Sequence, residues 1–310
     1  MSAEIEERIE KIPILRDLAR FLKGVKLQWL EGLSLYDLLE LYVIGIAEGA
    51  LSNRAGSIAF SFFMALFPFA LFIFNLIPYI PIEGFQQDFL KFVSEGVPPN
   101  TYYAIENIVD DILHNSNSGL LSSGFLLSIL LMANGLNAIL GGFENSRHIL
   151  VKRGFFHQYF VALGMSIILS FLLILTVATI VVFEVFIQKF TVHSVLNDQI
   201  PFIVLGRYVF LLLMILVTTS ILFKFGTKLD KSRSFISIGS VFTTIFTIII
   251  SYFFGIWVLR FSQYNQLYGS IGTLLIVMFY IWINCMILLL GFELNLAVNN
   301  LRKKKKIGIS

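Results

Sequence analysis

The chain is poor in the residues on which secreted modules and soluble domains rely. Among its 310 residues there is one cysteine, Cys285, so no disulfide can form within the chain. Charged residues make up 14% of the sequence, whereas a typical soluble domain has about 25%. These shortages exclude a disulfide-rich secreted module and disfavour a soluble globular domain. The lone thiol leaves the redox compartment open, because a buried cysteine is commonly only a small apolar side chain.

Residues with catalytic or metal-binding chemistry are also sparse. The four histidines are scattered over loops without the spacing of metal ligands. The sequence has no phosphate-binding glycine loop, no nucleophile elbow and no pair of catalytic carboxylates. Basic tracts occur without a recognisable nucleic-acid-binding module. We therefore expect no enzyme activity, no cofactor, no metal site and no nucleic-acid partner.

Apolar residues dominate what remains. They make up 57% of the chain, with 32 phenylalanines and a mean hydropathy of +0.82. About 20 apolar residues in a helix cross a hydrocarbon core of roughly 30 Å. This pattern predicts an all-α integral membrane protein with six transmembrane helices and no cleavable signal peptide. The predicted spans are about 55–80, 119–142, 158–187, 201–224, 235–260 and 268–299, with a bend or break at Pro68.

The distribution of lysine and arginine predicts the orientation. These residues cluster before the first span, in the second and fourth loops, and after the last span, where Arg302 and Lys303 to Lys306 form a basic tail at 301–310. The first and third loops each carry a single lysine. Because positive loops stay inside, both termini are predicted to lie in the cytoplasm. The protein is thus expected to be a multi-pass protein of the cytoplasmic membrane, with membrane lipids in contact with the tail.

Two predicted helical regions lie outside the spans. Residues 1–54 have amphipathic spacing, which suits either the membrane interface or packing against other cytoplasmic parts of the chain. Residues 82–118 carry acidic side chains between apolar residues at helical spacing, and Pro98 and Pro99 divide them. This loop is expected to form a helical hairpin on the outer face.

Amide side chains inside the predicted spans are functional candidates, because polar groups at membrane depth are costly. Asn134 and Asn137 share a face of the second span, and Asn284 and Asn295 share a face of the last. These residues form a candidate polar path. Two explanations stay open for the amides: they line a cavity, or they make hydrogen bonds between helices.

Charged side chains gather near the predicted inner ends of the spans. Arg54, Glu144, Arg147 and Glu293 could ring the mouth of a cytoplasm-facing cavity, or form salt bridges that brace the bundle. Glu293 lies nearly opposite Asn284 on the helical wheel, so the two cannot both face one narrow pore.

Toward the outer side, Glu184 and Arg207 fall at similar predicted depths. They form a candidate ion pair, and an Arg207 without a partner would instead suggest an anionic ligand. In the fifth span, small residues recur at helical spacing and predict a packing face: Ser240, Thr244, Thr247, Ser251 and Gly255.

Three stretches resemble the YihY/virulence factor BrkB family of bacterial cytoplasmic-membrane proteins. They are AGSIAFSFFMALFPF at 55–69, NGLNAILGGFENSRHIL at 134–150, and LYGSIGTLLIVMFYIWINCMILLLGFELNLAVN at 267–299. The last is the most specific, with a tyrosine-glycine-serine start and a glycine-x-glutamate-leucine-asparagine end. Two departures are Ala65-Leu66, where serine-leucine is usual, and a fourth loop without the family's frequent proline.

The resemblance implies a six-span envelope protein and makes transport of a lipid or small solute a reasonable expectation. Relatives were once labelled ribonuclease BN, a label now regarded as misassigned. Three hypotheses follow: a transporter or lipid translocator that acts in envelope homeostasis, a non-transporting envelope-integrity scaffold, and, least favoured, a ribonuclease. An oligomer is compatible with each.

Overall fold

The computed structural model describes residues 50–76, 118–146, 153–192, 200–227, 234–260 and 270–307, together with Gly24, Tyr36 and Ile149. The predicted outer hairpin and nearly all of the predicted N-terminal helices lie outside this described part. So do Arg147 and the side chain of Glu184. The chain as described is all-helical, with no strand, which confirms the expected fold class for these residues.

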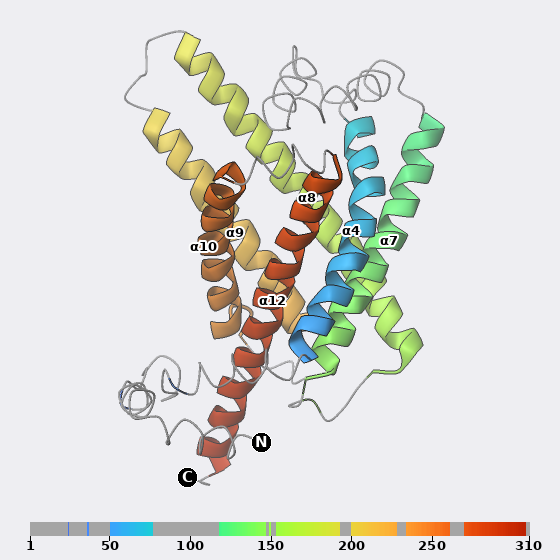
Figure 1. Cartoon of the computed structure of the whole chain (residues 1–310), viewed down its shortest axis with the longest axis vertical. Coiled ribbons are helices and arrows are strands. Elements are labelled where there is room, and N and C mark those ends of the chain that lie inside the picture. The colour runs from blue at the N-terminus through green and yellow to red at the C-terminus, as the bar shows by residue number, and fades with distance from the viewer. Residues whose placement is uncertain are drawn as a thin grey trace.

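Six helices make up the described structure (Figure 1). Their bounds are α4 (Ala50–Leu76), α7 (Ser118–Glu144), α8 (Phe155–Val192), α9 (Ile200–Phe225), α10 (Ile238–Arg260) and α12 (Ser270–Ile307). Each lies within a few residues of a predicted span, because apolar composition sets the length of a lipid-crossing helix. Helix α4 continues through residue 68, so Pro68 does not break it. Helix α12 continues beyond the predicted span into the basic tail.

Four of these helices contain segments long and apolar enough to cross a membrane. The segments are Phe155–Ile180, Leu205–Phe225, Ile238–Val258 and Leu274–Asn299. In α7 the apolar segment found among the described residues is the shorter Ile129–Glu144. The structure therefore describes a membrane protein, while the count of six spans and the placement of both termini in the cytoplasm stay predictions.

The six helices pack in a ring. The main contacts join α4 to α7, α7 to α8, α8 to α9, α9 to α10, α10 to α12, and α12 back to α4. Successive helices run in opposite directions, so the start of α4, the end of α7, the start of α8 and the end of α9 meet at one end of the bundle (Figure 1). The start of α10 and the second half of α12 join them there. We call this end of the bundle the closed end.

The hydrophobic core lies toward the closed end. Phe143 of α7 stacks on Phe292 of α12 with ring centroids 4.0 Å apart, and Phe223 of α9 lies 5.7 Å from both rings. All three side chains are buried. Three helices far apart in the sequence thus share one aromatic cluster, which fills the middle of the closed end.

Burial changes along α12. From Cys285 to Val298 most residues are buried, whereas none of the described residues from Leu274 to Asn284 is. Eleven residues make three helical turns, so every face of that segment is at least partly exposed. The helices therefore pack tightly at the closed end and loosely around the first half of α12.

Helices α10 and α12 approach each other most closely at two glycines. A Cβ atom on Gly239 would collide with the carbonyl oxygen of Gly291, and one on Gly291 would collide with the hydroxyl of Thr243. Small residues permit such backbone contact in membrane helices, where close packing stabilises association. Thr243 is buried at this contact. Thr244, from the expected packing face, is buried toward α9, where its hydroxyl lies 3.5 Å from that of Thr219.

Candidate functional site

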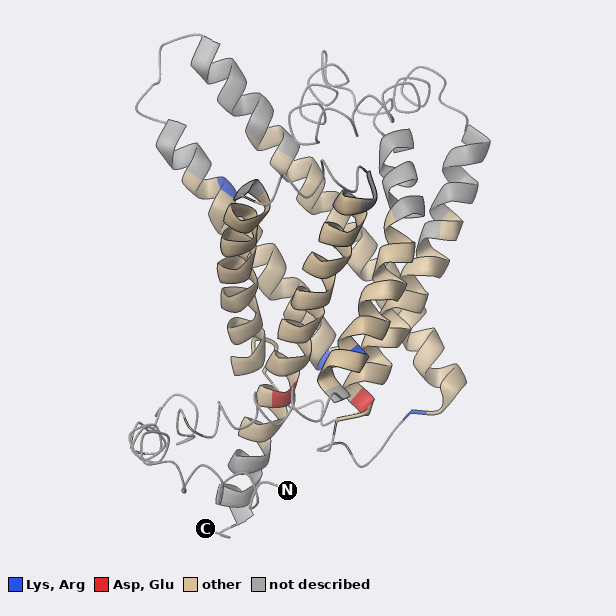
Figure 2. Cartoon of the chain, in the orientation of Figure 1, with Lys and Arg blue, Asp and Glu red and all other residues tan. Residues whose placement is uncertain are grey.

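A charged cluster lies at the closed end of the bundle. Figure 2 shows the acidic residues and most basic residues of the described part gathered there, with a basic residue in α9 near the opposite end. Two sets of contacts make up the cluster, and each joins three parts of the chain.

The first set centres on Glu293 of α12. Nη2 of Arg54, at the start of α4, lies 3.0 Å from Oε1 of Glu293. The hydroxyl of Ser146 donates to Oε2 of the same carboxylate at 2.6 Å, and Nη1 of Arg54 donates to the carbonyl oxygen of Asn145 at 3.2 Å. The Arg54 and Glu293 side chains are only 14% and 15% exposed. We call this set the Arg54–Glu293 clamp.

The second set centres on Arg153, which precedes α8. Its guanidinium donates to the carbonyl oxygens of Phe225 and Gly226 at the end of α9, at 2.9 and 3.0 Å. Its backbone N–H donates to Oε2 of Glu144 at 3.1 Å. Because free carbonyls at a helix C-terminus carry partial negative charge, a cation there is stabilising. We call this set the Glu144–Arg153 clamp.

The Glu144–Arg153 clamp leaves two buried polar atoms without a hydrogen bond, whereas the Arg54–Glu293 clamp leaves one, Nε of Arg54. Nε of Arg153 and Oε1 of Glu144 lie 4.0 Å apart, and both are buried without a hydrogen bond. Burial lowers the pKa of Arg153 from its ordinary value, and the negative charge of Glu144 opposes that shift. A buried charge with an unfilled hydrogen-bonding position is costly. Separating the groups of this clamp therefore costs less free energy than separating a fully bonded pair.

The four amides of the candidate polar path do not converge. Asn137 of α7 accepts a hydrogen bond from Gln158 of α8 at 2.9 Å, while Asn134 is exposed. Asn295 is buried beside Gly239, and its backbone carbonyl oxygen accepts a hydrogen bond from the Asn299 side chain, one turn later in α12. Asn284 donates to its own helix at Tyr280, and its Oδ1 is buried without a hydrogen bond. No hydrogen bond joins two of these four amides in the part of the chain that the structure describes.

Arg207 lies in the first half of α9, where its guanidinium sits 5.4 Å from the ring centroid of Tyr208. Since the Glu184 side chain lies outside the described residues, the expected pair between them stays a prediction. Among the described residues, no group of three His, Cys, Asp or Glu side chains could hold a metal ion.

Sequence reasoning missed three residues of these contacts. Arg153 was counted only as a charge that sets orientation, and Ser146 and Gln158 were not singled out. Arg153 had a usable signal, because a basic residue just before a span lies at the same membrane surface as Glu144. Nothing in the spacing of Ser146 or Gln158 marks them, since their partners lie on other helices.

Known proteins resemble most of this chain in sequence. A family model described as "Virulence factor BrkB" matches residues 45–308. The chain belongs to this family. A similar curated relative is the "Putative ribonuclease-like protein YfkH" of Bacillus subtilis (strain 168), 28% identical over 262 residues, which cover 82% of this chain and 91% of the relative. No solved structure matches the chain significantly. The family resemblance expected from the three sequence stretches is thereby confirmed.

Proposed function

We propose that this BrkB-family protein is a six-span protein of the cytoplasmic membrane that translocates a lipid or small amphiphilic solute in the service of envelope homeostasis. The observation that carries the proposal is the change of burial along α12 at Asn284. A protein with only a structural role in the bilayer has no need of a loosely packed half around one of its central helices. A translocator needs such a region to admit its substrate.

The chemistry of the exposed segment suits an amphiphile. Leu274, Leu275, Val277 and Phe279 are between 38% and 49% exposed. At the boundary with the packed half, Asn284 presents a buried amide oxygen without a hydrogen bond. An acyl chain would contact the leucine and phenylalanine side chains, and a headgroup donor would satisfy the Asn284 oxygen once the helices around it separate.

In this proposal the described conformation is closed on the charged side. The two clamps and the aromatic cluster of Phe143, Phe223 and Phe292 fill that end. Passage therefore requires α4 to separate from α12, and α9 to separate from α7. The aromatic contacts must then break together with the ion pairs and hydrogen bonds of the clamps, and water can replace the polar contacts at the membrane surface. The inner-mouth charges therefore act as a gate rather than as an open vestibule.

Reconstitution tests the proposal. The purified chain is placed in vesicles of phosphatidylethanolamine and phosphatidylglycerol that contain a trace of headgroup-labelled phosphatidylethanolamine, and dithionite bleaches label in the outer leaflet. We expect bleaching well beyond the outer-leaflet half, a severalfold slower rate for Asn284→Leu, and no change for Tyr252→Leu, an exposed residue of α10. A wild-type plateau equal to that of protein-free vesicles would overturn translocation of this lipid class.

A second candidate is a non-transporting envelope-integrity scaffold. The observation in its favour is that Arg54, Glu144 and Glu293 are engaged within the bundle, as in a rigid support. If replacing residues 82–118 abolishes the protein's contribution to envelope integrity while Asn284→Leu is silent, the scaffold is favoured. The ribonuclease in the relative's name becomes a candidate only if pure protein degrades RNA and a point substitution stops it.

A further inference from the structure

One polar side chain has no role in either clamp or in the loosely packed half. Asn134 of α7 is exposed, and it makes no hydrogen bond in the part of the chain that the structure describes. It precedes Glu144 by ten residues, which at about 1.5 Å per residue places it roughly 15 Å from the closed end. That depth is near the middle of a hydrocarbon core of about 30 Å.

An amide that faces lipid at this depth is unfavourable, because hydrocarbon offers it no hydrogen-bond partner. Its neighbour Asn137, one turn away, avoids the cost by bonding to Gln158. The exposed position of Asn134 therefore indicates a partner outside this chain.

The residues in line with Asn134 describe what that partner contacts. Leu127, Leu130 and Asn134 follow one another at spacings of three and four residues. Asn137 and Gly141 would continue the repeat, but they face Gln158 of α8 in the same chain. Leu127 and Leu130 are 51% and 47% exposed. A repeat of this kind makes a straight seam when two helices coil around each other, and a lone asparagine in a leucine seam selects register and partner number. We call Leu127, Leu130 and Asn134 the α7 seam.

We propose that the α7 seam is a homodimer interface in which Asn134 bonds to the same residue of a second copy. Two copies inserted in the same direction are related by a two-fold axis along the membrane normal, so identical residues meet at identical depth. An amide is self-complementary, since each side chain has both a donor and an acceptor.

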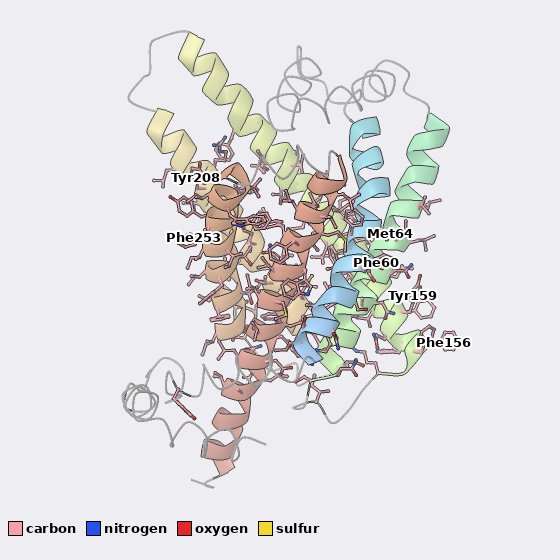
Figure 3. All side chains as sticks on the ribbon, in the orientation of Figure 1. Phe60, Met64, Phe156, Tyr159, Tyr208 and Phe253 are labelled. Carbon is pink, nitrogen blue, oxygen red and sulfur yellow. The ribbon has the colours of Figure 1, made fainter. Side chains whose placement is uncertain are left out.

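The surroundings favour a second copy over a lipid headgroup. The exposed side chains beside the seam are apolar, including Leu126 of α7 at 62% and Phe60 and Met64 of the neighbouring α4 at 57% and 50% (Figure 3). No lysine or arginine lies among the described residues of α7. A phosphate-bearing headgroup at this depth would need such a cation, whereas another leucine-rich helix face with one asparagine needs none.

Cysteine crosslinking tests the interface directly, and the single native cysteine makes the background simple. In full-length Cys285→Ala protein in membranes, Asn134→Cys is expected to form a disulfide-linked dimer on mild oxidation, and Leu130→Cys to crosslink through a short thiol reagent. An exposed position at a similar depth on α10, Ile249→Cys, serves as the control. It should remain largely monomeric.

A second measurement does not depend on cysteine chemistry. Photobleaching of single labelled proteins in vesicles should show two steps for the wild type and a shift toward one step for Asn134→Leu, which should fold because the residue faces lipid. One-step bleaching of the wild type, or equal crosslinking at residues 134 and 249, would overturn the dimer. A monomer in which Asn134→Leu slows lipid movement would overturn it in favour of a lipid contact. The dimer proposal does not depend on the translocation proposal.

Discussion

At the scale of single residues, the closed end depends on two arginines that bond to different partners. Arg54 bonds to a carboxylate and a carbonyl and ties α4 to α12. Arg153 bonds mainly to carbonyls and ties the start of α8 to the end of α9. Both use the planar, multi-donor geometry that lysine lacks.

Removing either partner of the Arg54–Glu293 clamp should destabilise the bundle. Arg54→Ala leaves a carboxylate that is largely shielded from water, at a cost of about 2 kcal/mol. Glu293→Gln keeps the shape of the side chain but loses the charge, and should cost less. Thermal unfolding in detergent measures both. The Arg54→Ala/Glu293→Ala double variant should lose less stability than the sum of the losses in the Arg54→Ala and Glu293→Ala single variants. Additive losses would mean that the two side chains do not interact in the membrane.

Arg153→Lys should be nearly as destabilising as Arg153→Ala. One ammonium group cannot donate along both carbonyl directions and still approach Glu144. The measurement is the rate of amide hydrogen exchange at the end of α9, which should rise in both variants while exchange in α10 stays slow. A lysine variant with wild-type exchange would show that charge alone suffices there.

At the scale of elements, the α10–α12 pair depends on contact between backbones. Gly239→Ala places a methyl group against the carbonyl oxygen of Gly291, which cannot move without a shift of the helix. We expect a loss of about 3 kcal/mol or more, since overpacking is costly where only backbone can yield.

Gly255→Ala in the same helix is the matched control. A Cβ atom at Gly255 would meet nothing within 4 Å, so alanine should be neutral or stabilise α10 by up to about 1 kcal/mol through helix propensity. Thermal unfolding of the two variants side by side tests the contact. Equal stability of Gly239→Ala and Gly255→Ala would contradict it.

At the scale of the whole molecule, the orientation of the ring in the membrane can be measured. In the Cys285→Ala background, Ser310→Cys should react with a membrane-impermeant maleimide only after the cells are opened. Gln87→Cys, in the predicted outer loop, should react in intact cells. Labelling of residue 310 in intact cells would reverse the predicted orientation of the C-terminus.

The closed end can also be locked. With Arg54→Cys and Glu293→Cys together, a bifunctional thiol reagent that spans the former ion pair should stop lipid movement in vesicles, because α4 can no longer leave α12. Each single cysteine variant treated with the same reagent is the control, and should keep translocating. Unimpaired movement through the crosslinked protein would show that the closed end is not a gate.

Much of the ring was predictable because lipid imposes a strong and local constraint. Each helix must satisfy its own backbone hydrogen bonds and present apolar side chains for the thickness of the core. The bounds of α7 and α9 therefore fall within two residues of the predicted spans. The family was predictable for a related reason, since the stretch at 267–299 keeps its glycines and polar residues at recognisable spacing.

Composition and periodicity thus determined the class of protein, the positions of the helices and the set of costly polar residues. The resemblance of three sequence stretches indicated the family. The tertiary structure alone decided how those polar residues are used. It pairs Glu144 with Arg153, seals the closed end with Phe143, Phe223 and Phe292, and leaves Asn134 on the outer surface of α7. The physical reason is that an apolar helix specifies its own length from its own residues, whereas a polar side chain is satisfied by whichever neighbour the packing of other helices brings to it.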